Sequence, residues 1–280
     1  MSKIVGIDIG GSTTKIVGFD QGTVIKPFLV RATDPVSSIY GAFGRFLSEN
    51  RLQLSDVERV MVTGVGSTFI HQRIFGIPTY KADEFKSIGL GGLFLSELPR
   101  AVIVSMGTGT AFVMADQNKA FHLGGTGVGG GTLLGLSNRM LNIRNFDDFV
   151  EMAQDGDLSH VDLSIADISH DKITGMPPET TASNFGKTLD LATTADLALG
   201  IINLVFQTIG MMAIFAARNE RATDVVLTGN LTNVPQAKDI FDDLTELHKV
   251  HFHMPSNAEY ATAVGAALTD ITGPGCKEIK

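Results

Sequence analysis

Asp8-Ile9-Gly10-Gly11-Ser12-Thr13-Thr14-Lys15 joins two apolar runs, residues 3–9 and 14–19, whose Val and Ile content is typical of buried strands. Glycine lets backbone N–H groups converge on an anion because no Cβ stands in the way, and the hydroxyls add further donors. A second turn of this kind is Ser105-Met106-Gly107-Thr108-Gly109-Thr110. One such turn is weak evidence, but two of them predict the two halves of a phosphate clamp for a nucleotide.

The order of elements around the first turn is repeated around the second. Residues 3–29 predict strand, glycine turn, strand, polar turn and strand, and residues 100–123 predict the same series. This repetition predicts an internal duplication of architecture, with two similar α/β lobes that face one cleft. We place the lobes at residues 1–98, with the first turn, and 99–280, with the second.

Composition narrows the class of partner. The 280 residues carry a formal net charge of −8 with a pI near 5.3, which argues against a nucleic-acid surface and favours a small-molecule partner. The lone Cys276 fits a reducing compartment, and the first residues lack a signal-peptide pattern, so we expect a cytoplasmic protein. The apolar stretch 197–217 contains Asn203, Gln207 and Thr208, and these residues favour a helix in the core or at a subunit interface over a membrane span.

Residues 124–132 hold six glycines in nine positions and lead into a predicted helix at 133–141. Such a density is costly in chain entropy. Two interpretations remain open: a flexible hinge, or a helix N-terminus whose free N–H groups bind an anion or a carbonyl group. Residues 147–173 predict a peripheral, acidic helical insertion, in which His160 and His170 have no metal-ligand spacing.

The ordered set of motifs resembles the superfamily of sugar kinases, actin and chaperone ATPases. The two phosphate turns come first, and Leu227-Thr228-Gly229-Asn230 takes the place of the adenosine element. Within that superfamily the chain resembles the type II pantothenate kinases over nearly its whole length. The segments that carry this resemblance are residues 6–12, 83–84, 107–110, 124–132, 182–186 (Ala-Ser-Asn-Phe-Gly) and 260–267.

The resemblance implies an actin-like ATPase (ribonuclease H-like) fold, with mixed sheets flanked by helices and the nucleotide between two similar lobes. It implies ATP- and Mg²⁺-dependent phosphorylation of the primary hydroxyl of pantothenate, the first step toward coenzyme A, by a homodimer joined through the 197–217 helix. Glu84 would be the general base, and Asp8 would hold Mg²⁺ through water. The implied nucleotide-binding residues are Asp8, Gly10, Gly11, Ser12, Thr13, Lys15, Gly107, Thr108, Gly109, Thr110, Gly129, Gly130, Gly131, Thr132, Gly229, Asn230 and Gly265.

The acceptor site implied by the resemblance consists of Glu84, Thr110, Ala111, His122 and Gly125. Two positions depart from the family pattern, because His122 stands where an Arg contacts the pantothenate carboxylate and Ala111 where a Ser is usual. His is shorter than Arg and only partly charged at neutral pH, so the clamp on the carboxylate is weaker or rebuilt from elsewhere. Pantetheine or a related hydroxyl compound is therefore an alternative acceptor.

Simpler roles remain open for several of these residues. Asp8 as a turn cap, Lys15 as an exposed strand residue, and Asp83 with Glu84 as stabilisers of a helix N-terminus are the alternatives. An N-acetylhexosamine kinase would share the phosphate turns, although the glycine run and residues 182–186 speak against it. An activating ATPase that acts on a protein partner is the alternative from another class, for which the lone Cys276 is poorly placed to bind a cluster.

Overall fold

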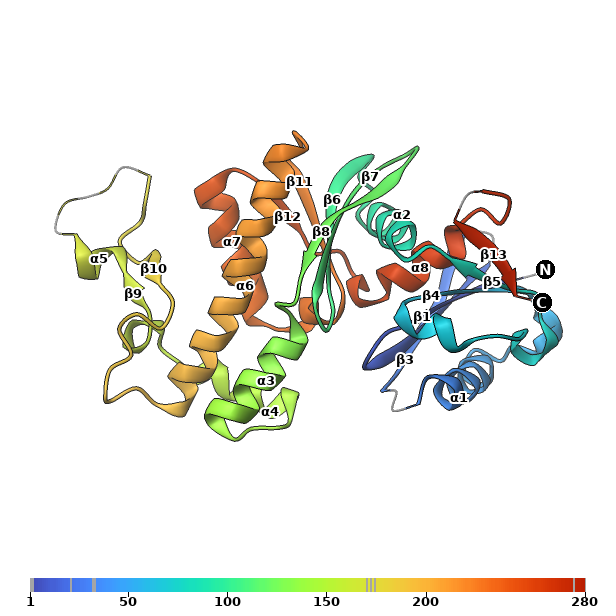
Figure 1. Cartoon of the computed structure of the whole chain (residues 1–280), viewed down its shortest axis with the longest axis horizontal. Helices are drawn as coiled ribbons and strands as arrows, with labels where there is room; N and C mark the ends of the chain where they lie inside the picture. The colour runs from blue at the N-terminus through green and yellow to red at the C-terminus, as the bar shows by residue number, and fades with distance from the viewer. Residues whose placement is uncertain are drawn as a thin grey trace.

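The computed structural model describes residues 3–20, 22–31, 34–169, 171, 173, 175–273 and 275–279. Two mixed β-sheets lie beside each other in Figure 1, with helices between them and on their outer sides. The expected α/β architecture is confirmed. His170 lies outside the described residues.

The first sheet is built from β1 (Lys3–Ile9), β2 (Thr13–Asp20), β3 (Thr23–Arg31), β4 (Val57–Thr63), β5 (Thr79–Ala82) and β13 (Cys276–Ile279). Their order is β13-β5-β4-β1-β2-β3, with β1 parallel to β4 and antiparallel to β2. Helix α1 (Pro35–Glu49) covers one face, where Phe43 and Phe46 are fully buried with Ile7 and Val62. Alternation along β1 therefore leaves Asp8 on the other face.

The second sheet repeats this plan with β6 (Arg100–Met106), β7 (Thr110–Asp116), β8 (Ala120–Thr126), β11 (Asp224–Thr228) and β12 (His251–His253). Their order is β12-β11-β6-β7-β8. In both sheets a glycine turn separates the first two strands of a three-stranded antiparallel meander. The predicted duplication of the strand–turn–strand series is confirmed.

The apolar stretch forms α6 (Thr194–Asn219), which packs against the second sheet beside α3 (Gly130–Leu141), α4 (Phe146–Met152) and α7 (Gln236–His248). Phe206 and Ile209 are fully buried in a core that also contains Val102 and Val104 of β6. The helix is long and apolar enough to cross a membrane, but 61% of its most apolar 18-residue stretch is buried inside the fold. It is a core helix of the second lobe.

Two helices, α2 (Glu84–Ser96) and α8 (Ala261–Leu268), cross between the two sheets (Figure 1). The helix α2 buries Ile88 against Ile103 of β6 in the second sheet, and α8 buries Ala263 against Val17 of β2 in the first sheet. The last strand, β13, also joins the first sheet. The expected division into lobes 1–98 and 99–280 therefore needs a correction, because α8 and β13 pack on the first sheet and α2 on the second.

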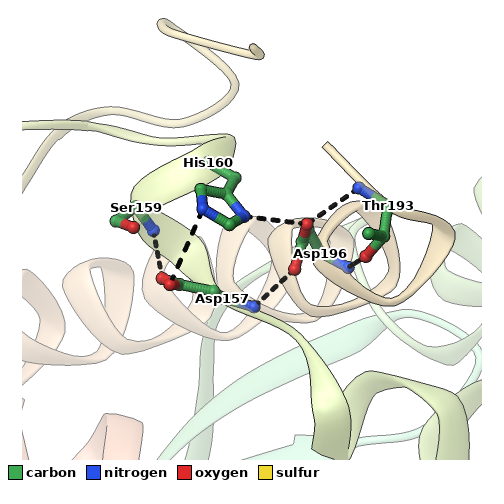
Figure 2. Close-up of polar contacts among 5 residues, drawn as sticks. All are labelled: Asp157, Ser159, His160, Thr193 and Asp196. Carbon is green, nitrogen blue, oxygen red and sulfur yellow. Dashed lines mark hydrogen bonds and ion pairs between the residues drawn. The ribbon is translucent and has the colours of Figure 1, made fainter. Parts of the chain in front are cut away.

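The insertion predicted at residues 147–173 is peripheral only in its later part, because its first residues belong to α4, where Phe149 is fully buried in the core of the second lobe. The later part lies at the far side of this lobe (Figure 1) and contains α5 (Ile165–Ile168) and β9 (Leu163–Ser164), which forms a ribbon with β10 (Thr181–Ser183). Figure 2 shows how it is tied to α6: the Asp196 carboxylate accepts hydrogen bonds from the backbone N–H groups of Thr193 and Asp157, and His160 Nδ1 lies 3.1 Å from its Oδ2. These hydrogen bonds hold the pKa of Asp196 well below its usual range. His160 thus has a structural role.

Short 3₁₀ helices complete the chain at η1 (Leu54–Asp56), η2 (Val65–Phe69), η3 (Ile74–Gly76), η4 (Ala153–Asp155), η5 (Leu158–His160), η6 (Asn230–Asn233) and η7 (Ala258–Tyr260).

Candidate active site

Three polar side chains lie in a row across the first sheet, at the end of β1. The β1–β2 register pairs Asp8 with Lys15, and the β1–β4 register pairs Asp8 with Thr63. Lys15 Nζ lies 3.8 Å from Asp8 Oδ2, and both side chains are buried. The alternative that Lys15 is an exposed strand residue is therefore wrong. Burial raises the pKa of the Asp8 carboxyl, and the Lys15 ammonium opposes this rise.

Glu84 is the first residue of α2, where the preceding strand β5 and the crossing with α8 position it. Asp83 is the N-cap: its carboxylate accepts a hydrogen bond of 2.8 Å from the backbone N–H of Lys86. The two acidic residues therefore differ in role, as expected if only one acts on the substrate. Burial raises the pKa of the Glu84 carboxyl, and the negative charges of Asp8 and Asp83 raise it further.

The two phosphate turns face each other. A Cβ built on Gly11 would lie 3.8 Å from the Thr108 hydroxyl oxygen, so the turns approach closely. Within the described part of the chain, the backbone N–H groups of Gly11, Ser12, Thr108 and Gly109 donate no hydrogen bond, and they are free to bind an anion. Asn230, from the expected adenosine element, donates from Nδ2 to the Thr13 hydroxyl over 3.3 Å.

The glycine run is docked on the second phosphate turn. The N–H groups of Gly130 and Gly131 donate to the carbonyl oxygens of Gly107 and Thr108, each over 2.9 Å. The N–H of Gly129 donates to the hydroxyl of Thr132. The expectation of free N–H groups at this helix N-terminus is therefore wrong for residues 129–131, and so is that of a flexible hinge, because the turn itself supplies the acceptors.

Close backbone approach is the reason for the glycines in this run. A Cβ on Gly129 would lie 2.8 Å from the Thr108 carbonyl oxygen, and a Cβ on Gly109 would lie 2.9 Å from the Thr126 carbonyl oxygen. No other residue lets the run and the turn pack at this distance. The glycine run therefore packs directly against the second phosphate turn and supports its backbone.

The expected acceptor residues gather on β7 and β8, next to the start of α2. Ala111 and Gly125 are partners in the β7–β8 register. The His122 ring stacks on Phe85, with 3.9 Å between ring centroids and 16° between planes. Since Phe85 follows Glu84, the stack brings His122 close to the candidate base. Thr110 is buried, and its hydroxyl donates to the Val128 carbonyl over 2.8 Å, which ties β7 to the glycine run.

The remaining expected residues lie in two places. Gly229 follows β11 with φ 91, and a Cβ there would lie 2.4 Å from the Met106 carbonyl oxygen, so it packs behind the second phosphate turn. Asn230 has a buried Oδ1 atom without a hydrogen-bond partner in the described part of the chain. Gly265 instead lies in the α2–α8 crossing, where a Cβ would be 1.7 Å from the Ser87 carbonyl oxygen. Its contacts are with α2 rather than with the phosphate turns.

Sequence reasoning missed Thr63 and Gly64. Gly64 has φ 85, and a Cβ there would lie 2.6 Å from Asp8 Oδ1, so the turn after β4 forms one wall of the Asp8 site. The signal was present, because a Thr-Gly pair ends a buried run that is predicted to lie next to the Asp8 strand. Only the register between β1 and β4 shows that the pair meets Asp8.

The expected magnesium ion would have few side-chain ligands in this site. No group of three or more His, Cys, Asp or Glu side chains suited to a metal occurs among the residues that the structure describes. Mg²⁺ keeps several waters and is bound through one or two carboxylates plus the phosphates of its substrate. A single buried carboxylate, Asp8, beside free N–H donors for phosphate fits a magnesium ion that arrives with a nucleotide.

Comparisons with known proteins point to one family. The Fumble family model matches residues 97–266. A type II pantothenate kinase of Staphylococcus aureus is 29% identical over 274 residues, which cover 94% of this chain and 97% of that protein.

Two solved structures share the fold. An activator of the 2-hydroxyisocaproyl-CoA dehydratase from Clostridium difficile with bound ADPNP has a TM-score of 0.68 at 16% identity, covering 95% of this chain and 93% of that one. A ROK family glucokinase from Streptomyces griseus, in complex with glucose and AMPPNP, has a TM-score of 0.60 at 12% identity, covering 97% and 100%. The expected two-lobed, actin-like ATPase fold is confirmed. With the family model matching more than half of its length, the chain belongs to the Fumble family, the family of the type II pantothenate kinases.

Proposed function

We propose that the protein transfers the γ-phosphoryl group of ATP to pantothenate and forms 4′-phosphopantothenate, the first step of coenzyme A biosynthesis. The family and the curated relatives named type II pantothenate kinase support this activity. The observation that carries it is the position of Glu84: its pKa is raised by burial and by Asp8, so a carboxylate suited to proton transfer lies within the field of the candidate cation site.

The nucleotide end of the site combines backbone N–H groups with the side chains of the first phosphate turn and of β2. The N–H groups of the two facing turns, with the hydroxyls of Ser12 and Thr13, bind phosphate oxygens, and Lys15 offsets the negative charge on the transferring group. Asp8 would hold Mg²⁺ through water. The magnesium ion supplies charge neutralisation on the phosphates when bound. Gly229 and Asn230, next to the phosphate turns, would contact the adenosine.

The acceptor end positions a hydroxyl for attack. Glu84 accepts the proton of the primary hydroxyl as its oxygen bonds to phosphorus, and the bond to the leaving ADP oxygen breaks. His122 and Gly125 bind the rest of the acceptor. The stack on Phe85 fixes the His122 ring, and Ala111 leaves the neighbouring strand position without a polar group. Gly107, Thr108 and Gly109 are held in place by Thr110 and residues 129–132.

An activating ATPase is the rival function, because one solved neighbour is the activator of a dehydratase and has ADPNP bound. The chain has one cysteine, Cys276, on β13 of the first sheet. A dimer would therefore offer two thiolates, whereas a cubane iron–sulfur cluster is held by four. This count favours the kinase.

The assembly we propose is a cytoplasmic homodimer joined through α6. Along this helix Leu204, Thr208, Met211 and Phe215 follow helical spacing on one side and retain solvent exposure, with Phe215 60% exposed. A second copy would cover this apolar stripe. Light scattering tests the assembly, and a monomer at all concentrations would contradict it.

The activity is tested with purified protein and Mg-ATP, offered pantothenate, pantetheine, N-acetylglucosamine or no acceptor, while ADP release is followed. We expect release that depends on pantothenate. ATP turnover that is independent of every small acceptor would contradict the kinase. Glu84→Gln serves as the chemical control: it should bind ATP as the parent does and lose about 10²- to 10⁴-fold in turnover.

A further inference from the structure

The Thr63 hydroxyl is buried without a partner. Thr63 is fully buried, and its Oγ1 makes no hydrogen bond with any residue in the described part of the chain. A buried hydroxyl loses its bonds to water and gains nothing in return, which is unfavourable. Native structures keep such groups mainly where a ligand, ion or water completes the bond.

The position of Thr63 identifies what could complete it. Thr63 is the partner of Asp8 in the parallel register between β4 and β1, and both side chains point to the face covered by α8, where Met61 packs with Ala266. Neighbouring strands lie about 4.8 Å apart. Gly64 then turns the chain so closely around Asp8 that a Cβ would lie 2.6 Å from Oδ1. Thr63 and Asp8 are therefore buried neighbours on one face of the sheet, next to the turn at Gly64.

A second orphan hydroxyl provides the contrast. Thr14 Oγ1 is also buried without a partner in the described residues, but Thr14 lies on the other face of β2. Ile16, on the same face of β2, packs in the α1 core with Phe43, away from Asp8. An orphan hydroxyl alone thus does not indicate a ligand, and the register with Asp8 is what distinguishes Thr63.

We propose that Thr63 is a positioning residue for the divalent cation, whose hydroxyl accepts a hydrogen bond from a water in the hydration shell that Asp8 holds. This rests on the proposed function, since it requires a magnesium nucleotide at Asp8. Waters bound to Mg²⁺ are donors, and a Thr hydroxyl has acceptor capacity, whereas the Lys15 ammonium on the other side of Asp8 has none. The row Lys15–Asp8–Thr63 therefore offers one cation, one anion and one neutral acceptor.

The test compares Thr63→Val and Thr63→Ser with Thr14→Val as the matched control. Binding of AMPPNP is measured by calorimetry with Mg²⁺ and with EDTA, and the unfolding temperature of each ligand-free protein is measured alongside. We expect Thr63→Val to reduce the gain in affinity that Mg²⁺ provides by about three- to tenfold, the value of one hydrogen bond. Its binding in EDTA should not change. Thr63→Ser should retain most of the gain, and Thr14→Val all of it.

The unfolding temperature separates a ligand role from a structural one. Because the hydroxyl has no partner among the residues that the structure describes, Thr63→Val should unfold at the same temperature as the parent or a higher one. A Thr63→Val protein with the full Mg²⁺-dependent gain overturns the proposal, and so does one that unfolds at a lower temperature or loses affinity equally in EDTA. Parent protein that binds no AMPPNP contradicts the proposed function itself.

Discussion

The carboxylate of Asp8, at the end of β1, raises the pKa of Glu84, at the start of α2, although one residue belongs to the first sheet and the other to a helix packed on the second. The α2–α8 crossing brings them together. Charge at the candidate cation site therefore acts on the candidate base. A cation beside Asp8 offsets the negative charge of Asp8 and lowers the pKa of Glu84 toward its ordinary value.

Removing the charge of Asp83 should extend activity to lower pH. Glu84 is a base only when ionised, so kcat/KM falls as pH drops through its pKa. Asp83 is one of the charges that raise this pKa, and Asp83→Asn lowers it. Asn is as good an N-cap as Asp, so α2 should stay intact. We expect the acid limb of the profile of kcat/KM against pH to move to lower pH.

Asp34→Asn is the matched control for this experiment. Asp34 caps α1 with a hydrogen bond from the Ser37 N–H, and α1 lies on the face of the first sheet opposite to Asp8. Its replacement should leave the acid limb in place. An acid limb that does not move in Asp83→Asn would remove Glu84 as the group that it reports.

Replacing His122 by Arg should strengthen recognition of a carboxylate. Arg can keep the stack on Phe85 and adds a permanent charge with bidentate donors. We expect the KM for pantothenate to fall about ten- to hundredfold, the value of a charge-assisted hydrogen bond, with kcat little changed. Pantetheine, which lacks the carboxylate, is the internal control, and a fall of both KM values together would contradict the placement of His122.

The α2–α8 crossing should not tolerate a single methyl group. In Gly265→Ala the new Cβ would meet the Ser87 carbonyl oxygen at 1.7 Å, so the helices must separate, at a cost of about 3 kcal/mol in the free energy of unfolding. Gly135→Ala, in the exposed part of α3 with open space around its Cα, should stabilise the protein by about 0.5–1 kcal/mol. Urea unfolding measures both, and equal effects would contradict the close crossing.

The tie between the insertion and α6 should depend on pH. The folded-state pKa of Asp196 lies below its ordinary value, so its stabilisation is present above about pH 4 and is lost as pH falls further. Asp196→Asn should lower the free energy of unfolding by about 1–2 kcal/mol at pH 7, because its hydrogen bonds are no longer charge-assisted. This difference should narrow below pH 4. Asp190→Asn, an exposed position of the same region, should show no difference at either pH.

Much of the candidate site could be predicted from the sequence because its parts are local. Glycines and hydroxyls at Gly10–Thr13 and Gly107–Thr110 define turns through backbone sterics alone. The apolar runs beside them are strands for the same local reason. The acidic pair at the start of a helix also limits its two members to a cap and one free carboxylate.

The rest depended on partners that are distant in the chain. Periodicity shows that α2 and α8 each have an apolar face, but not which sheet each face covers, so a boundary at residue 98 separates both helices from the sheets on which they pack. The sequence of the glycine run also suits a free helix N-terminus. Only the folded structure shows that the carbonyl oxygens of Gly107 and Thr108 accept hydrogen bonds from its N–H groups. Thr63 can be assigned to the site only from its register with Asp8.

The sequence by itself determined the turns, the strands and the family, because backbone chemistry and local pattern depend on residues that are close together in the chain. The tertiary structure decided which carboxylates lie close enough to interact and which donors stay free, because both depend on packing between residues far apart in the chain, such as Asp8 with Glu84 and Thr13 with Asn230.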